Sequence, residues 1–460
     1  MSRWLIALKL ILTLLYLAGW VLALIGLGWA GLAPLWRRLV RHDRRITLLP
    51  LLALTWLCGL LVNYGLVLIV SDLRLALGLG AALAVAGLTH LGFMLHRAAR
   101  TGNLALGSSL TWLGVGLLLA LYAVPILTQP LQTWDARSIW FFHARMIYVA
   151  GELSPATGLD HRSIAFSHPD YPKLIPALAA QLTTLRGYWN EYLPKAALWL
   201  ALGPAFLGLF SLARQRIAFL FLLTVLPFSL RGWLWNGYMD GHLALYLTLA
   251  LLFIGRALLS GDDLDFLLGL TTLALLPNIK NEGYLAALAS LIAWGITAWL
   301  RRKSGDAKVW VEAFRSKATW VYLGLMIMPM GLWNVKKALW GLNNDLDLGS
   351  AASVTRLLTR LGDGSLDTIL RMAYPYLYGG ILVFLFIVTV LILQRRALPS
   401  TAHVALLTAG LYLLGLLAIY LATPHDLNWH LRTSVDRTLL GVDAAAFVAG
   451  YFMLGELEER

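Results

Sequence analysis

Apolar residues dominate this chain in runs of about 20, and short polar segments separate the runs. A run of this length can cross the hydrocarbon core of a bilayer as a helix, whose backbone hydrogen bonds are satisfied internally. The pattern predicts about thirteen spans and therefore an all-α, polytopic transmembrane bundle. The predicted spans cover residues 4–30, 47–70, 73–96, 105–128, 193–213, 217–231, 240–257, 264–279, 283–301, 318–338, 367–394, 403–422 and 435–453.

Composition supports the same fold class. Of the 460 residues, 59% are hydrophobic and only 13% are charged, which excludes an ordinary soluble domain. The net charge of +13 could indicate nucleic-acid binding, but the Arg and Lys residues cluster in short loops between spans, as in the cytoplasmic loops of membrane proteins. No nucleic-acid partner is therefore expected. The single cysteine, Cys58, excludes an intramolecular disulfide.

The basic loops also predict sidedness. When all of them are placed in the cytoplasm, the spans alternate consistently only if the segment Tyr171–Arg186 does not cross the membrane. We therefore expect this segment to lie on the external surface as an amphipathic helix within an external loop, residues 129–192. Most of the unusual polar motifs then collect on that external face, which favours a one-sided active site. The basic loops are 37–45, 97–100, 214–216, 301–317 and 395–396.

The first motif on that face follows the fourth predicted span and reads WDARSIWFFHAR, residues 134–145. Asp135 has two interpretations. It suits the N-cap of a helix, and it also suits a general base that activates an acceptor hydroxyl near the membrane surface. The two roles are compatible. Arg137 is a candidate for the lining of the same site.

The second motif, HPDYPKLIP, covers residues 168–176. Its prolines predict a rigid turn at the start of the surface helix, and a purely structural turn is one interpretation. The other interpretation is the margin of a site, because several polar side chains occur at the same depth. The candidate lining residues are His168, Asp170 and Tyr171, and Lys173 is a candidate phosphate ligand.

Two further motifs lie at span ends. GYMD at residues 237–240 precedes a span, and in LPNIKNEG at 276–283 the polar residues follow a short apolar span. Asp240 and Glu282 are candidate lining residues. Lys280 either forms a simple boundary pair with Glu282 or binds an anionic lipid phosphate on a face that has few other cations.

The last motif, TPHDLNWHLRTSVDR, covers residues 423–437. Arginine binds phosphate through a planar fork of donors, so Arg432 and Arg437 are the candidate phosphate ligands here. His430 and Asp436 are candidate lining residues. The spacing does not match a zinc-binding HExxH motif. The two histidines, His425 and His430, together with an aspartate could hold a divalent ion, but nothing else in the sequence supports one, and we predict no metal or other cofactor.

Taken together, these motifs resemble the GT-C superfamily of membrane glycosyltransferases. Within it, the chain looks most like the bacterial group of lipopolysaccharide sugar transferases and protein-mannosyltransferase-like enzymes. The resemblance covers about residues 105–455 and implies a GT-C-like catalytic domain at 105–460, preceded by separate transmembrane helices at 1–104. The motifs that carry it are WDARSIWFFHAR, HPDYP, GYMD, LPNIKNEG and YLATPHDLNWHLRTSVDR.

The resemblance implies transfer of one sugar from a polyprenyl-phosphate donor to a lipid, glycan or protein acceptor, with inversion and with Asp135 as the base. It also implies a bacterial inner-membrane protein whose active site faces away from the cytoplasm. The family often carries a second acid beside the first. Here Ala136 follows Asp135, which counts against a metal-dependent mechanism.

Two rival functions remain open. An O-antigen ligase or polymerase is also polytopic, but it resembles this chain less in the WDAR and HPDYP motifs. A lipid or solute transporter would favour ionisable residues near the middle of spans and internal repeats. The sequence has few of the former and no convincing repeat.

Overall fold

The computed structural model describes residues 3–39, 45–300, 314, 316–346, 348–395 and 397–458. The described chain is almost entirely helical, which confirms the predicted all-α class. Two short strands, β1 (Ile46–Thr47) and β2 (Leu104–Ala105), pair in parallel, with Ile46 opposite Leu104. The predicted basic segments at 40–44 and 301–313 lie outside the described residues.

The chain divides into two compact units, which are described separately. Unit 1 comprises Met1–Gly158, Lys173–Ser211 and Ser316–Trp333, and unit 2 comprises Leu159–Pro172, Leu212–Arg315 and Asn334–Arg460. The division therefore falls inside one helix, α14 (Lys317–Leu339), rather than only in loops. A separate domain that ends at residue 104 stays a prediction from the resemblance.

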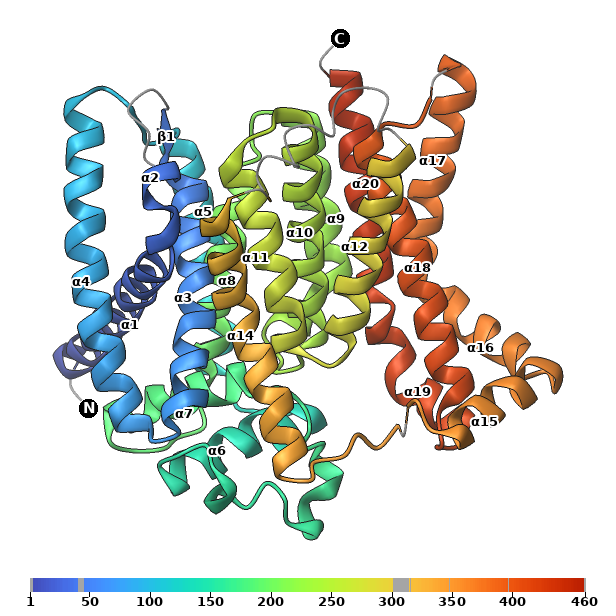
Figure 1. The fold of residues 1–460 in the computed structure, drawn as a ribbon, viewed down its shortest axis with the longest axis horizontal. Coiled ribbons are helices and arrows are strands. Elements are labelled where there is room, and N and C mark those ends of the chain that lie inside the picture. Colours follow the sequence, from blue (N-terminus) through green and yellow to red (C-terminus); the bar gives the residue numbers. More distant parts are fainter. Residues whose placement is uncertain are drawn as a thin grey trace. The chain divides into compact units, whose positions relative to one another are not determined.

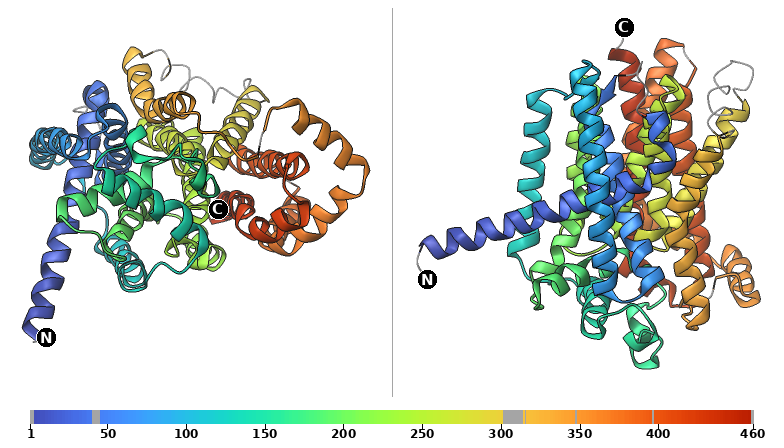
Figure 2. Two further views of the ribbon diagram at one scale, coloured as in Figure 1. Left: turned by 90° about the horizontal axis from the view of Figure 1, so that it is seen from below. Right: turned by 60° about the vertical axis from the view of Figure 1, so that its left-hand side comes forward.

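Unit 1 is built around α1, which packs on α3 and α4, and around α8, which packs on α3 and α5. The N-terminal half of α1 extends beyond the helices against which its C-terminal half packs (Figure 2, right). The elements are α1 (Arg3–Gly31), η1 (Ala33–Leu35), α2 (Trp36–Leu39), α3 (Leu48–Val70), α4 (Leu73–Arg100), α5 (Ser109–Thr128), η2 (Ala136–Trp140), α6 (Phe141–Ala150), η3 (Pro155–Thr157), α7 (Leu174–Arg186), η5 (Leu193–Lys195) and α8 (Ala196–Phe210).

In unit 2, α10 packs on α11 and α20, and α18 packs on α12 and α20 (Figure 1). The most deeply buried helices of this unit are α10, α11 and α20, whose apolar residues are covered nearly all round. The elements are η4 (Arg162–Ser167), α9 (Arg216–Leu230), η6 (Arg231–Leu234), α10 (Asp240–Ser260), α11 (Asp263–Ile279), α12 (Glu282–Leu300), α15 (Ala351–Gly362), α16 (Ser365–Ala373), η8 (Tyr374–Tyr376), α17 (Tyr378–Gln394), α18 (Ser400–Ala422), α19 (Leu427–Thr438) and α20 (Leu440–Glu458).

Within the described residues, 11 helices are long and apolar enough to cross a membrane, and the protein is an integral membrane protein. A twelfth span is possible if α16 and α17, which are bent by 80° at their junction, count as one. The predicted span 264–279 forms α11, but its 17 residues reach only about 25 Å, less than a typical hydrocarbon core. The candidate spans are Ile11–Gly31, Leu48–Val70, Leu73–Arg100, Ser109–Thr128, Leu193–Phe210, Arg216–Leu234, Asp240–Ser260, Glu282–Leu300, Lys317–Leu339, Ser400–Ala422 and Leu427–Glu458.

The predicted surface helix Tyr171–Arg186 requires a correction. A helix forms, but α7 begins at Leu174, three residues later, and every residue from Leu174 to Thr183 is buried. It is therefore not an amphipathic helix with one exposed polar face. The physical reason is that α3, α4, α6 and α8 all pack against it. Its polar Gln181 is satisfied inside the unit, where it accepts a hydrogen bond of 2.6 Å from Asn63.

Candidate functional site

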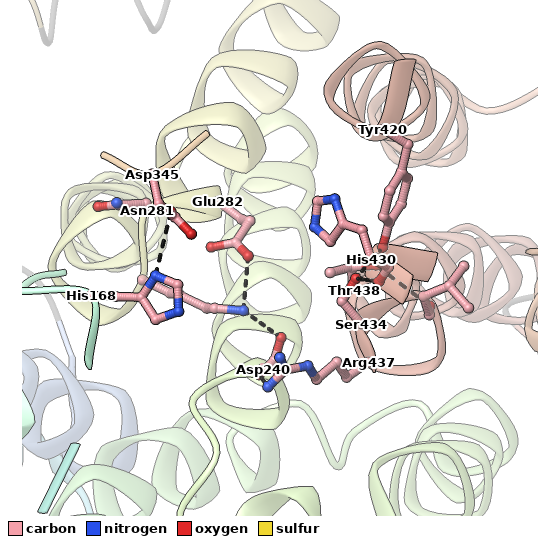
Figure 3. Close-up of polar contacts among 12 residues, drawn as sticks. His168, Asp240, Asn281, Glu282, Asp345, Tyr420, His430, Ser434, Arg437 and Thr438 are labelled. Atoms are coloured by element: carbon pink, nitrogen blue, oxygen red, sulfur yellow. Dashed lines mark hydrogen bonds and ion pairs between the residues drawn. The ribbon is translucent and has the colours of Figure 1, made fainter. Parts of the chain in front are cut away.

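The most developed polar site lies in unit 2, at one end of its helices. A cavity of about 380 Å³ is lined by the N-terminus of α12, the segment after α11, one face of α19, the end of α18, the loop after α14 and the turn at His168. Figure 3 shows the polar side chains that converge there. Candidate residues from three of the predicted motifs contribute to this lining, and these motifs are far apart in the sequence.

Lys280 is the centre of this polar cluster. Its ammonium Nζ lies 2.7 Å from Asp240 Oδ1 and 2.8 Å from Glu282 Oε1, and the Lys280 side chain is only 3% exposed. Burial opposes the charged form of Lys280, but the two carboxylates outweigh it and raise the pKa of the ammonium above its ordinary value. The two acids thus favour the charged form of the lysine that lies between them.

The local sequence explains how Lys280 reaches this position. Helix α11 ends at Ile279, and Lys280 has an extended backbone, so the chain leaves the helix axis there. Helix α12 then starts at Glu282, whose charge suits a helix N-terminus. The next residue must be Gly283, because a Cβ there would lie 2.0 Å from the carbonyl oxygen of Leu276. The KNEG sequence thus encodes a tight turn between two closely packed helices.

Arg437 is the second cation of the cluster. Its Nη1 lies 3.8 Å from Asp240 Oδ2, and its guanidinium carbon lies 4.7 Å from the centre of the Tyr238 ring. Arg437 comes from α19, whose first turn is capped by Asp426 through a 2.8 Å bond to the N–H of Trp429. Asp240 therefore joins both cations, one on each of its oxygens.

The two predicted phosphate ligands on α19 have different environments. Arg437 lines the cavity, as do His430 and Ser434, because these residues lie on one face of the helix. Arg432 lies on the opposite face and is exposed. The helical period separates two arginines that the sequence motif places together. Asp436 is half-buried beside Arg437 but is not among the residues that line the cavity.

Asp345 connects two histidines at the edge of the cavity. Its Oδ1 lies 3.3 Å from His168 Nδ1, and its Oδ2 lies 3.2 Å from His425 Nε2. Burial alone would raise the pKa of the Asp345 carboxyl, but the hydrogen bonds and charges of the two histidines outweigh it and lower that pKa. His168 has a left-handed backbone (φ 51°), a conformation that is uncommon for a residue other than glycine.

The predicted turn at His168–Pro172 is anchored by its own aspartate. Asp170 is 2% exposed, and its Oδ2 accepts hydrogen bonds from Asn281 (2.7 Å) and Asn344 (2.9 Å). This arrangement gives Asp170 a structural role, in line with the structural interpretation of the motif. Tyr171 stacks on the His168 ring with centres 4.9 Å apart, and burial raises the pKa of its hydroxyl.

The cavity also contains polar atoms that find no hydrogen-bond partner among the described residues. These are Glu282 Oε2, Asn281 Oδ1 and His430 Nδ1, each fully shielded by its surroundings. Buried polar atoms of this kind call for an explanation, and a bound polar ligand is one. By contrast, the hydroxyl groups behind His430 form a closed network, because Tyr420 Oη bonds both Ser434 and Thr438 at 2.9 Å.

Three predicted site residues lie in unit 1. Asp135 is 8% exposed and precedes a short π-helical segment, but its side chain makes no N-cap hydrogen bond there. Arg137 is exposed. Lys173 is fully buried, with its Nζ 5.0 Å from the centre of the Trp333 ring and its backbone N–H bonded to Tyr64 Oη at 3.0 Å. The roles of Asp135 as base and of Lys173 as phosphate ligand stay predictions.

Several residues of the cavity were not among the sequence-based candidates. Asp345, Asn344, His425 and Tyr420 are the most important of them. A signal was present for three of them. The polar run Asn343-Asn344-Asp345 begins five residues after the predicted span 318–338, and His425 lies within the motif at 423–437. Among the described residues, no group of three His, Cys, Asp or Glu side chains is arranged to hold a metal ion.

The chemistry available to this site follows from its charges. Lys280, Arg437, Glu282, Asp345 and three histidines line a cavity at the ends of apolar helices, and Asp240 lies beside it in contact with both cations. Such a site can stabilise a developing negative charge through Arg437 and Lys280, and it can accept hydrogen bonds from hydroxyl groups through Glu282 and Asn281.

Comparison of the chain with protein-family models, with curated proteins and with solved structures finds no match.

Proposed function

We propose that this protein is a membrane glycosyltransferase that moves a sugar from a polyprenyl-phosphate donor to an acceptor on the side of the membrane away from the cytoplasm. The acceptor is a lipid, a glycan or a protein, and a bacterial inner membrane is the proposed location. The proposal rests on the resemblance to the GT-C superfamily and on one structural observation. That observation is the buried Lys280–Asp240–Arg437 cluster beside a cavity at the ends of apolar helices.

In the proposed mechanism, the leaving group is a lipid phosphate, which needs charge stabilisation rather than protonation. Arg437 is the proposed phosphate ligand, because a guanidinium can offer two parallel donors to phosphate oxygens. Lys280 is a second cation whose charge is balanced by Asp240 and Glu282, and Asp240 also pairs with Arg437. Positioned charges of this kind act most strongly in a site from which water is excluded.

The orphaned acceptors fit the same proposal. A sugar ring carries hydroxyl groups, which would donate hydrogen bonds to Glu282 Oε2 and Asn281 Oδ1. Asp135 is the proposed general base for the acceptor hydroxyl, and this assignment rests on the sequence motif alone. Direct displacement of the phosphate by the activated hydroxyl predicts inversion at the anomeric carbon.

The placement of the charged groups favours this proposal over a transporter. Asp240 and Glu282 are the first residues of α10 and α12, and Lys280 follows the last residue of α11. A transporter is expected to place its ionisable groups near the middle of spans. The described cluster lies instead at helix ends.

Mass spectrometry of envelope glycans and glycolipids from a deletion strain tests the proposal. Loss of the gene should remove one sugar from a glycan and leave the matching polyprenyl-phosphate sugar to accumulate. The wild-type gene should restore the sugar. In the Asp135→Asn variant, turnover should be lower than in the wild type by about two orders of magnitude or more, since a carboxamide cannot act as a base.

A matched control is Asp160→Asn, an exposed carboxylate of the same predicted external loop, which should behave as wild type. An unchanged glycan profile in the deletion strain would overturn the proposed function. Normal turnover by Asp135→Asn would instead remove only the assignment of the base.

A further inference from the structure

Helix α15 presents an exposed apolar face that no described element covers fully. Val354, Leu358 and Leu361 are 55%, 64% and 50% exposed, and their spacing of four and three residues places them on one side of the helix. Thr355 and Thr359 are also exposed but follow Val354 and Leu358 by one residue, which turns them by about 100° onto a polar face. The helix is therefore amphipathic on its accessible surface.

Helix α16 follows α15, and the bend between α16 and α17 indicates how α16 is oriented relative to the membrane. It is bent by 80° from α17, whose 17 residues include the exposed Leu382 (65%) and Leu393 (76%). An apolar helix with exposed leucines along its length faces lipid in an integral membrane protein. If α17 enters the bilayer, the bend places α16 close to the membrane plane, with Leu370 (48%) still exposed.

The corner between α16 and α17 carries the side chains expected at a membrane surface. Tyr374, Tyr376 and Tyr378 are 54%, 46% and 51% exposed, and tyrosine is enriched where headgroups meet hydrocarbon. Arg371 is also exposed at the end of α16, where it pairs with Asp367 at 2.8 Å. The exposed apolar surface of α17 thus leads, through a group of exposed tyrosines, to Leu370 on α16, which lies beside the exposed Asp367–Arg371 pair, and α15 is the other helix of the hairpin that α16 forms.

The opposite face of α15 is fixed to the protein by two arginines. Arg356 Nε donates to the carbonyl of Ala422 at 2.8 Å. Arg360 donates to the carbonyls of Thr423 at 2.8 Å and His425 at 3.3 Å. Ala422 is the last residue of α18, and Thr423 and His425 lie in the short segment between α18 and α19. Helices α15 and α16 pack beside α18 and α19 at this point (Figure 1).

We propose that the hairpin formed by α15 and α16 is an interfacial anchor, which rests its apolar face in one leaflet of the bilayer. The lipid surface is the partner that fits, because the apolar face of α15 belongs to a hairpin that joins the lipid-facing helix α17 through three exposed tyrosines, and because the exposed Asp367–Arg371 pair of α16 suits the headgroup region. Since Arg360 holds the carbonyl of His425, the anchor also fixes the edge of the cavity at a set depth relative to the leaflet. The anchor does not depend on the proposed function.

Fluorescence quenching by lipids tests the anchor. In a Cys58→Ser background, Leu358→Cys is labelled with an environment-sensitive dye, and the full-length protein is placed in nanodiscs that contain spin-labelled lipids. We expect the dye at position 358 to be quenched about twofold or more by labels at shallow acyl positions. The matched control is Thr359→Cys, one residue away on the polar face, which should be quenched mainly by a soluble quencher.

A second apolar position, Val354→Cys, guards against a local folding defect and should behave as Leu358→Cys does. Equal lipid quenching at positions 358 and 359 would overturn the proposal. It would also be overturned if position 358 were protected from both lipid and soluble quenchers and crosslinked between copies of the chain. That result would show a protein partner in place of lipid.

Discussion

Lys280 is buried between two carboxylates, and the stability of this arrangement depends on all three charges. Removing the ammonium would leave Asp240 and Glu282 close together without their shared cation. Breaking a buried ion pair on one side is strongly destabilising, whereas removing both partners costs much less. Single substitutions in this cluster therefore test whether the balance of its charges stabilises the fold.

We expect Lys280→Gln to lower the free energy of unfolding by about 3–5 kcal/mol. The double variant Lys280→Gln/Asp240→Asn should recover part of this loss, because it removes one of the uncompensated carboxylates. Thermal unfolding in nanodiscs gives the comparison. Arg371→Gln, which breaks an exposed pair on α16, is the control and should change stability little. If the double variant is less stable than Lys280→Gln alone, the charge-balance account is wrong.

The same account fixes a pH dependence for this loss. The pKa of Lys280 is raised in the folded protein, so its stabilising contribution is complete below the pKa of the unfolded chain, about 10.4. It is lost only as the pH rises through the higher folded value. The stability difference between wild type and Lys280→Gln should therefore not decrease as the pH is raised from about 7 to about 9. A difference that shrinks within this range would contradict the raised pKa.

At the scale of elements, α15 holds the segment between α18 and α19 through backbone carbonyls. Arg360 reaches four carbonyl oxygens, those of Tyr420, Leu421, Thr423 and His425. The last carbonyls of a helix have no partner within the helix, so a guanidinium with several donors suits this position. This contact lets an element outside the cavity set the position of His425 inside it.

Arg360→Gln should therefore loosen this segment without unfolding the protein. Hydrogen–deuterium exchange is expected to rise about tenfold or more for amides in residues 421–430, since local opening becomes easier. Exchange in α10 should not change, because α10 is covered by other helices of unit 2. Unchanged exchange at residues 421–430 would show that other contacts hold the segment.

Much of the element pattern could be predicted from the sequence. Long apolar runs determine spans because backbone groups in lipid must be satisfied internally, and this constraint acts within each segment. The elements that were predicted wrongly are those whose position depends on packing against other helices. Helix α7 was predicted as an amphipathic surface helix, but four other helices cover it. The predicted span 367–394 includes most of α16, but an 80° bend separates α16 from α17, and the short helix α15 lies in the polar region before them.

At the scale of the whole molecule, the sequence predicted the ingredients of the candidate site better than their connections. The Lys280–Glu282 pair, one of the two interpretations of this motif, is present in the structure, and it joins residues that are close in sequence. The other interpretation, that Lys280 binds phosphate, stays a prediction. The third partner of the pair, Asp240, is 40 residues away, and periodicity within one segment carries no information about such a contact. Likewise, Asp345 was missed because its role depends on His168 and His425, which come from distant segments.

The central claim is that the cavity in unit 2 binds a lipid phosphate through Arg437. The most direct test is binding of undecaprenyl monophosphate to the purified protein in nanodiscs, with undecaprenol, which lacks the phosphate, as the reference lipid. The wild type should bind the phosphate form about tenfold more tightly or better, a difference of about 1.4 kcal/mol. Arg437→Gln should lose this preference, and Arg432→Gln, on the opposite face of α19, should keep it. Equal binding of the two lipids by the wild type, or equal loss in both variants, would contradict the claim.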